Sequence, residues 1–102
     1  MESKIINGHT VVFTLSENNS FENIRISEEV NNFIADFQNV NVEVLEVIKN
    51  NLIKFANSVS KNRGTFVVIS KFSFDEKLNI VPTLQEAQDF IEMEEIERQL
   101  EL

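Results

Sequence analysis

A change of hydrophobic period between residues 32 and 70 constrains the fold more than any other feature of the chain. Residues 32–37 form a short apolar run that closes on an acid and precedes polar residues, as a buried strand does. From Val42 to Val59 apolar residues recur at steps of three and four, which predicts an amphipathic helix. Residues 65–70 are β-branched or aromatic and mostly apolar, which predicts a central strand. Strand, helix and strand with short joints predict a parallel βαβ unit.

The predicted helix carries start and stop signals of its own. Asn41 is placed to cap the first amides, and Glu43 lies near the positive end of the helix dipole. Lys61 and Arg63 lie near the negative end, and Gly64 is expected to take the left-handed conformation that ends a helix. The residues expected to face the core are Val44, Leu45, Val47, Ile48, Leu52, Phe55, Ala56 and Val59, and those of the opposite, polar face are Glu43, Glu46, Asn50, Lys54 and Asn57.

The N-terminal third predicts a hairpin and a polar connection. Residues 4–15 contain two β-rich runs around Asn7 and Gly8, which favour a two-residue type I′ turn between antiparallel strands. The connection from Ser16 to Asn31 is short and polar. Within it, residues 21–30 fit a short strand or a helical turn, and the sequence leaves both open.

The C-terminal third predicts one more strand and a second helix. Residues 78–81 form a short β-rich run closed by Pro82, and Thr83 with Glu86 makes a capping box. The residues expected to pack inward are Leu84, Ala87, Phe90 and Ile91, with Met93, Ile96 and Leu100 continuing the stripe. We therefore expect a single α/β domain over residues 1–102, with a mixed sheet of about four to five strands, two main helices and a shortened first crossover.

Charge and composition bound the partners and the compartment. Seventeen acidic against nine basic side chains give a formal net charge of -8, which disfavours binding to nucleic acid and to anionic lipid. The chain has no cysteine, so disulfides and thiolate metal sites are excluded. Apolar runs such as residues 66–69 are far too short to span a membrane or to form a signal-peptide core. We expect a soluble cytoplasmic protein.

Residues with catalytic potential do not form any standard constellation. The single histidine, His9, has no second histidine or cysteine with which to hold a transition metal, and we expect a turn or strand residue rather than a general base. No serine lies in a nucleophile elbow, and two glycines cannot form a phosphate-binding loop. The acidic run Glu92, Glu94, Glu95 and Glu97 is expected to be a solvated helix face rather than a hard-cation site. We expect no enzyme, cofactor or metal.

The order of elements and three segments carry a family resemblance. Residues 32–40 form an apolar strand that ends in an acid, residues 63–69 a glycine-led central strand, and residues 78–87 a last strand followed by the start of a helix. These resemble the STAS domain, the fold of bacterial anti-sigma factor antagonists, over about the C-terminal two-thirds of the chain. Residues 93–98 resemble a subgroup of small STAS-like proteins associated with ribonuclease Z in some bacteria.

Two departures from that family shape the expected function. Members that are switched by a kinase carry a phosphorylatable serine or threonine at the start of the helix after the acidic strand. Here the acceptor position falls near Leu45 or Glu46, so the phosphoswitch is absent. The helix that joins the second and third strands is cut down to residues 16–31, which should uncover apolar surface. We expect a partner or a second copy to cover that surface, as a dedicated complex or a homodimer.

The resemblance implies a non-catalytic regulatory module that binds a protein partner, such as an anti-sigma or kinase-like protein. The partner-binding residues that it implies are Asn41, Glu43, Glu46 and Asn50, at the start of the helix. Glu46 there is either a fixed negative charge in place of a phosphate or an ordinary solvated position. The alternative is an accessory subunit of a nucleic-acid-processing system, suggested by the ribonuclease Z association. A small enzyme of unrecognised type would need a concave pocket with perturbed titratable groups.

Overall fold

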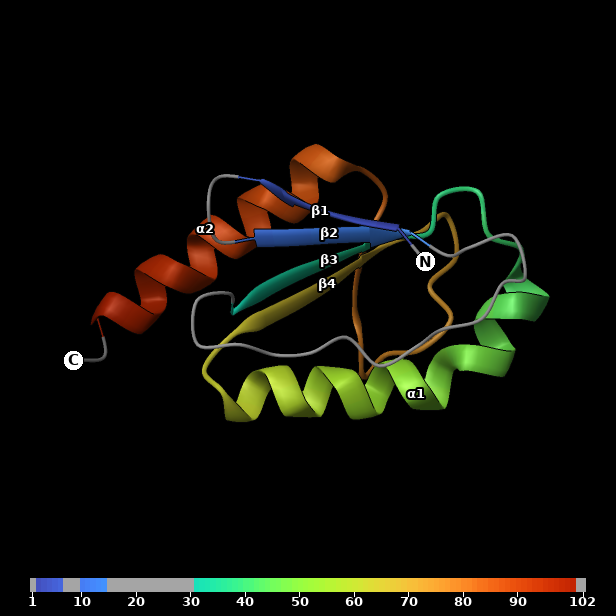
Figure 1. Cartoon of the computed structure of the whole chain (residues 1–102), viewed down its shortest axis with the longest axis horizontal. Helices are drawn as coiled ribbons and strands as arrows, with labels where there is room; N and C mark the ends of the chain where they lie inside the picture. Colours follow the sequence, from blue (N-terminus) through green and yellow to red (C-terminus); the bar gives the residue numbers. More distant parts are fainter. Residues whose placement is uncertain (1, 7–9, 15–30, 101–102) are drawn as a thin grey trace.

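The structure, a computed structural model, describes residues 2–6, 10–14 and 31–100 as one five-stranded sheet with a helix on each face (Figure 1). The elements are β1 (Glu2–Ile6), β2 (Thr10–Thr14), β3 (Asn32–Asp36), α1 (Val42–Lys61), β4 (Thr65–Ile69), β5 (Asn79–Val81) and α2 (Leu84–Leu100). The strands lie in the order β1-β2-β3-β4-β5; β1 and β2 are antiparallel, and the other neighbours are parallel. The predicted α/β fold with a mixed sheet and two helices is therefore confirmed.

Several sequence predictions lie outside the described residues. They are the turn at Asn7 and Gly8, the position of His9, and the conformation of residues 21–30. The shortened crossover also lies there, because only Asn31 of the connection from Ser16 is described. The antiparallel pairing that the hairpin requires is present, with Ile6 opposite Thr10 as the pair nearest the turn.

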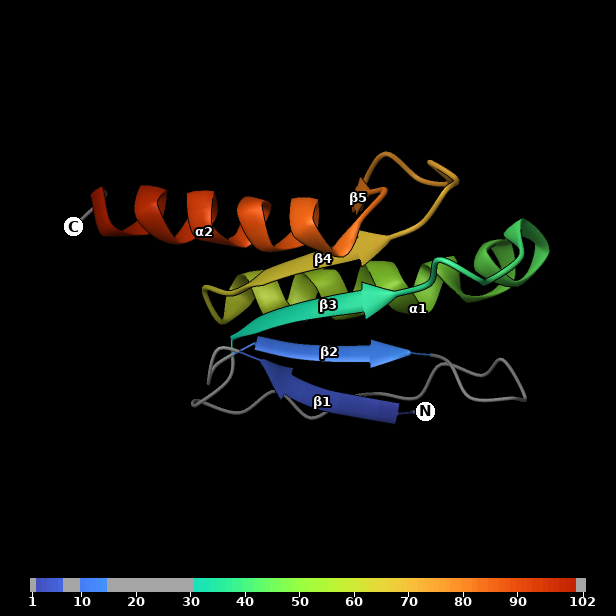
Figure 2. The same ribbon diagram turned by 90° about the horizontal axis from the view of Figure 1, so that it is seen from above.

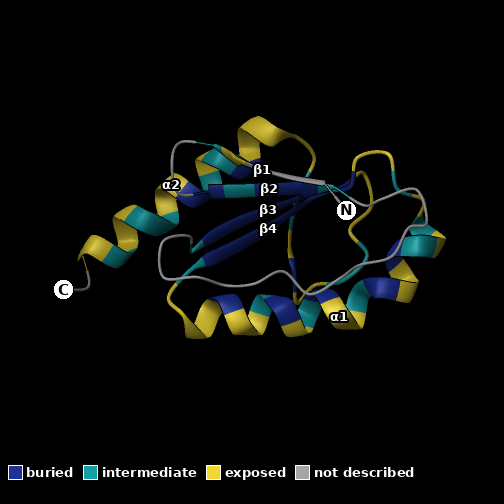
Figure 3. Cartoon of the chain, in the orientation of Figure 1, coloured by how far each residue is buried: buried dark blue, intermediate teal, exposed yellow. Residues whose placement is uncertain are grey.

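The larger core lies between the sheet and α1, and phenylalanine rings dominate it. Phe55 of α1 meets Phe33 and Phe66 edge to face, with ring centroids 5.1 Å and 5.0 Å apart. It also meets Phe13 of β2, at 6.1 Å. Edge-to-face contacts of this kind add to the hydrophobic gain from burying the rings. Figure 3 shows this face of α1 buried along most of the helix. The buried residues of α1 are Leu45, Ile48, Leu52, Phe55 and Val59.

Val47 is the one clear error in the predicted stripe of α1. Its side chain is 81% exposed, whereas its sequence neighbour Ile48 is buried. At 100° per residue, Val47 lies roughly 120° round the helix from the centre of the buried stripe, too far to reach the sheet. The sequence pattern includes Val47 because it follows Val44 by three positions. The side of α1 that contacts the sheet is narrower than the predicted apolar stripe and does not include Val47.

The start of α1 also differs in detail from the prediction. Asn41 occupies the N-cap position in an extended conformation, but its side chain makes no capping hydrogen bond. Its backbone carbonyl instead accepts hydrogen bonds from the amides of Val44 and Leu45, at 3.1 Å each. Asn41 therefore begins the helix through its backbone, and its side-chain amide stays exposed at the surface.

At the other end of α1 it is Arg63, not Gly64, that adopts the left-handed conformation, with φ of 60°. The amide of Arg63 donates to Ser60 O and that of Gly64 to Val59 O, the two hydrogen bonds of a Schellman motif. A Cβ at position 64 would lie 1.8 Å from the carbonyl oxygen of Asn31. Glycine is therefore required at position 64, because the backbone of Asn31, just before β3, approaches it closely. The adjacent Arg63 takes the positive φ, which is unfavourable for a residue with a Cβ.

The second core lies between the sheet and α2 and is smaller. Its buried members are Val12, Ile34, Val67, Ile69, Ala87 and Ile91. The Thr83 hydroxyl accepts a hydrogen bond from the amide of Glu86, which is one of the two hydrogen bonds of the predicted capping box. All five residues of β4 are buried, because α1 covers one face of this strand and α2 covers the other.

The second half of α2 contradicts its predicted stripe. Met93, Ile96 and Leu100 are 63%, 56% and 80% exposed, and Leu84 is also exposed. Figures 1 and 2 show the reason, since the C-terminal turns of α2 run beyond the ends of the strands and have no sheet beneath them. Their positions also lie roughly opposite Ala87 and Ile91 round the helix.

Candidate interaction site

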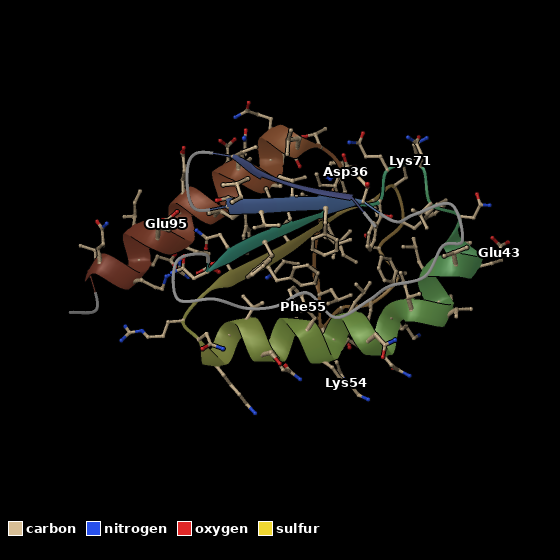
Figure 4. All side chains as sticks on the ribbon, viewed as in Figure 1. Asp36, Glu43, Lys54, Phe55, Lys71 and Glu95 are labelled. Carbon is tan, nitrogen blue, oxygen red and sulfur yellow. The ribbon has the colours of Figure 1, made fainter. Side chains whose placement is uncertain are left out.

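The predicted partner-binding residues share one exposed face at the start of α1. Glu43, Glu46 and Asn50 are exposed and follow each other at steps of three and four, so they lie along one side of the helix. Asn41 precedes them at the N-cap and is also exposed. Figure 4 shows Glu43 directed away from the sheet, while Phe55 of the same helix points into the core. The helix therefore brings the four residues together.

Val47 is the member of this face that sequence reasoning missed. It lies within one helical turn of Glu43, Glu46 and Asn50, and its side chain is exposed beside theirs. The sequence could have indicated this, because Val47 lies at a large angle round the helix from Leu45, Ile48 and the other buried residues, and only one side of α1 can face the sheet. We refer to Asn41, Glu43, Glu46, Val47 and Asn50 together as the α1 face.

The charge of Glu46 is shared with a neighbouring lysine. Lys49 Nζ lies 2.9 Å from Glu46 Oε2, one turn along the helix. The hydrogen bond that Lys49 donates to Glu46, and then the negative charge of Glu46, raise the pKa of Lys49 above 10.5, and Asp75 adds a smaller effect of the same sign. An ion pair at this exposed position leaves Glu46 a weaker substitute for a phosphate than an isolated carboxylate would be.

A buried polar row crosses the sheet under α2. Thr10, Asn32 and Thr65 are neighbours in register on β2, β3 and β4, and all three are buried. Asn32 Nδ2 donates to Glu95 Oε1 at 3.2 Å. Arg98 donates from Nη1 to Thr65 Oγ1 at 2.7 Å and from Nη2 to Asn32 Oδ1 at 3.4 Å. The row therefore joins α2 to the start of two central strands.

This row corrects the prediction that the acidic run is a solvated helix face. Glu92 and Glu97 are exposed, as expected, but Glu94 and Glu95 are half-buried and Glu95 bonds to a buried amide. No local pattern in the sequence indicates this pairing, because Asn32 and Glu95 lie 63 positions apart. A buried amide with a charged partner is satisfied, so the contact orients α2 on the sheet.

Grooves lie beside α2 in the described part of the chain, and a small one of about 260 Å³ is lined by Asn31, Arg63, Glu95, Arg98 and Gln99. Of the two larger ones, the first, about 590 Å³, runs between α2 and the paired strands β1 and β2. Its lining residues are Ile6, Thr10, Gln85, Gln88, Ile91, Glu92, Glu95 and Ile96. The second, about 480 Å³, lies between the end of α1, β4 and α2, where Arg63, Lys77 and Arg98 face Glu94 and Glu97.

Within residues 2–6, 10–14 and 31–100, no group of three or more His, Asp or Glu side chains is arranged to hold a metal ion. None of the helices in that part of the chain has the length and apolar character needed to cross a bilayer. Comparisons with protein-family models, curated proteins and solved structures find no match to the chain.

Proposed function

We propose that the chain is a non-catalytic protein-interaction module of the anti-sigma factor antagonist type, which binds a protein partner through the α1 face. The observation that carries this proposal is the 81% exposure of Val47 at the centre of a polar and acidic surface. An apolar centre with a polar rim is the usual anatomy of a protein interface. The resemblance of the chain to STAS domains supports the same position, because family members present the start of this helix to their partners.

The packing of α1 on the sheet makes its exposed side suitable as a binding surface. The opposite side of the helix is fixed to the sheet by five buried residues along its length, so the α1 face is presented on a rigid element. A preorganised surface loses little conformational entropy on binding. Because the position of the phosphoacceptor is occupied by Leu45, which is buried, and Glu46, binding would be constitutive and independent of a kinase.

The compartment and assembly state follow as parts of this proposal. The module acts in the cytoplasm, which the absence of cysteine and the short apolar runs favour. Of the two expected assemblies, a dedicated complex and a homodimer, we favour the complex, because the net charge of -8 makes two copies repel each other. Light scattering at tens of micromolar should give the monomer mass, and a dimer mass would restore the homodimer.

The test is affinity purification of the tagged chain from its own cell, with Glu43 and Glu46 both changed to lysine. The matched control changes Glu76 and Asp89 to lysine, two exposed acids that lie off the α1 face. Reversing two charges at an interface should cost several kcal/mol of binding, so the partner should be lost in the first variant and kept in the second. Retention in both variants, or loss in both, would contradict binding through the α1 face.

The nature of the captured protein separates the two candidate functions. An anti-sigma or kinase-like protein would support regulation. A nuclease or a ribosomal component, lost in the same variant, would instead support the accessory role in a nucleic-acid-processing system. In either case these residues are not the nuclease itself, because the single histidine cannot supply its histidine-rich metal motif.

A further inference from the structure

The overhanging end of α2 carries a second unpartnered apolar surface. Met93, Ile96 and Leu100 follow each other at steps of three and four, so they form one line along the outward side of the helix. Glu92 and Glu97 border this line and are exposed. We call these five residues the overhang surface. Figures 1 and 2 show that the sheet does not extend beneath this part of α2.

The overhang surface continues into the larger groove. Glu92 and Ile96 belong to both, and the groove adds Ile6 and Ile91 as apolar residues and Glu95 as a further acid. A helix laid beside α2 could therefore contact the groove with one part of its apolar face and the overhang with another. Helix-in-groove recognition works in this way, through apolar anchors one turn apart.

Charge decides what kind of helix fits. The acidic residues on the outward half of α2 are Glu86, Asp89, Glu92 and Glu97, all exposed. Arg98 is the single basic residue of α2, and it points to the sheet, where it bonds to Thr65 and Asn32. The surface thus offers apolar anchors between acidic borders and no outward cation of its own. Its complement is an apolar stripe bordered by lysine or arginine.

A second copy of the chain is a poor complement. Packing α2 against α2 of another copy would set Glu92 and Glu97 near like charges. Packing α2 on α1 of another copy would supply Lys54 and Lys61, but Val47 is the only large apolar residue exposed on α1. One valine does not match the three apolar side chains of the overhang surface.

We propose that the overhang surface and the adjoining groove dock a basic amphipathic helix of a partner protein. The apolar residues of that helix, at i, i+3 or i+4 and i+7, would cover Met93, Ile96 and Leu100. Its lysine or arginine residues would face Glu92, Glu95 and Glu97. This site lies on the opposite face of the sheet from α1 and does not depend on binding at the α1 face (Figure 1).

The probe is a synthetic helical peptide with leucine at i, i+3, i+4 and i+7 and lysine at its other positions, carrying a fluorophore. Fluorescence anisotropy with the full chain should show binding that weakens with salt, and a peptide with glutamate in place of lysine should not bind. Changing Ile96 and Leu100 to serine should weaken binding about tenfold or more, whereas Val47→Ser should leave it within about twofold.

A pair of charge variants separates a docking site from general attraction to an acidic protein. Glu92→Lys with Glu97→Lys and Glu43→Lys with Glu46→Lys change the net charge equally. The first pair should weaken peptide binding about tenfold and the second less than about threefold. Equal weakening by both pairs, binding of the glutamate peptide, or no binding of the lysine peptide would overturn the proposal. A dimer of the free chain that Ile96→Ser and Leu100→Ser dissociate would assign the surface to a second copy instead.

Discussion

The two helices cover opposite faces of the same sheet, but they are held to it in different ways. α1 buries five apolar side chains along its length, against the phenylalanine rings of β2, β3 and β4. α2 buries only Ala87 and Ile91, both in its first half, and its second half is tied to the sheet by Glu95 and Arg98. Hydrophobic burial therefore fixes α1, and hydrogen bonds orient the part of α2 that leaves the sheet.

This difference predicts which helix tolerates the loss of an apolar side chain. Phe55→Ala should lower the free energy of unfolding by about 3–5 kcal/mol, because the ring is buried among Phe13, Phe33 and Phe66. Leu100→Ala should change it by less than about 0.5 kcal/mol, because the side chain is exposed. Urea denaturation followed by circular dichroism measures both. Comparable losses in the two variants would break the contrast between the helices.

The close fit at the end of α1 gives the next largest effect. Gly64→Ala should destabilise the fold by about 2–3 kcal/mol, because its Cβ would meet the Asn31 carbonyl, which also accepts the amide of Thr65. Arg63→Gly is the matched control and should stabilise by about 1 kcal/mol, since glycine adopts a positive φ without a steric penalty. Thermal unfolding of the two variants should move in opposite directions, and a stabilising Gly64→Ala would contradict the close approach of the Asn31 carbonyl to position 64.

The polar attachment of α2 predicts a smaller cost. Arg98→Ala removes two hydrogen bonds and leaves Asn32, which is 1% exposed, with one contact fewer, so stability should fall by about 1–2 kcal/mol. Glu97→Ala, one position earlier and exposed, should be nearly neutral. Hydrogen exchange of the α2 amides should rise in the first variant only. If the α2 amides exchange at the same rate in Arg98→Ala as in the unchanged chain, the burial of Ala87 and Ile91 would be enough to hold α2 on the sheet.

The same contrast explains how far the sequence could predict the fold. The strands β3 and β4 and the helix α1 have strong local hydrophobic patterns, and the structure confirms all three elements. Apolar residues of all three pack together in one core. Met93, Ile96 and Leu100 are regularly spaced among themselves, but they lie roughly opposite Ala87 and Ile91 round α2. They therefore form a separate stripe rather than a continuation of the buried one, and the prediction joined the two stripes.

The candidate sites show the same limit. Four of the five residues of the α1 face, all but Val47, could be predicted together, because one helix carries them. Val47 was assigned to the core by its spacing, and the width of the buried arc became visible only with the sheet in place. The row of Thr10, Asn32 and Thr65 with Glu95 and Arg98 could not be predicted, because strand register brings distant positions together and no local pattern encodes it.

The smallest effect concerns the electrostatics of the α1 face. Because Glu46 raises the pKa of Lys49, the pair stabilises the folded chain while Lys49 is protonated, and this contribution is lost as the pH rises through the raised pKa. Glu46→Gln should therefore lower the pKa of Lys49 toward 10.5, as measured by NMR titration of its side chain. Glu43→Gln, which lies on the same face without contact to Lys49 in the described ion pairs, should leave that titration nearly unchanged. An equal shift in both variants would mean that the lysine senses the general acidity of α1 rather than its partner one turn away, and Glu46 would then be free to meet a bound protein.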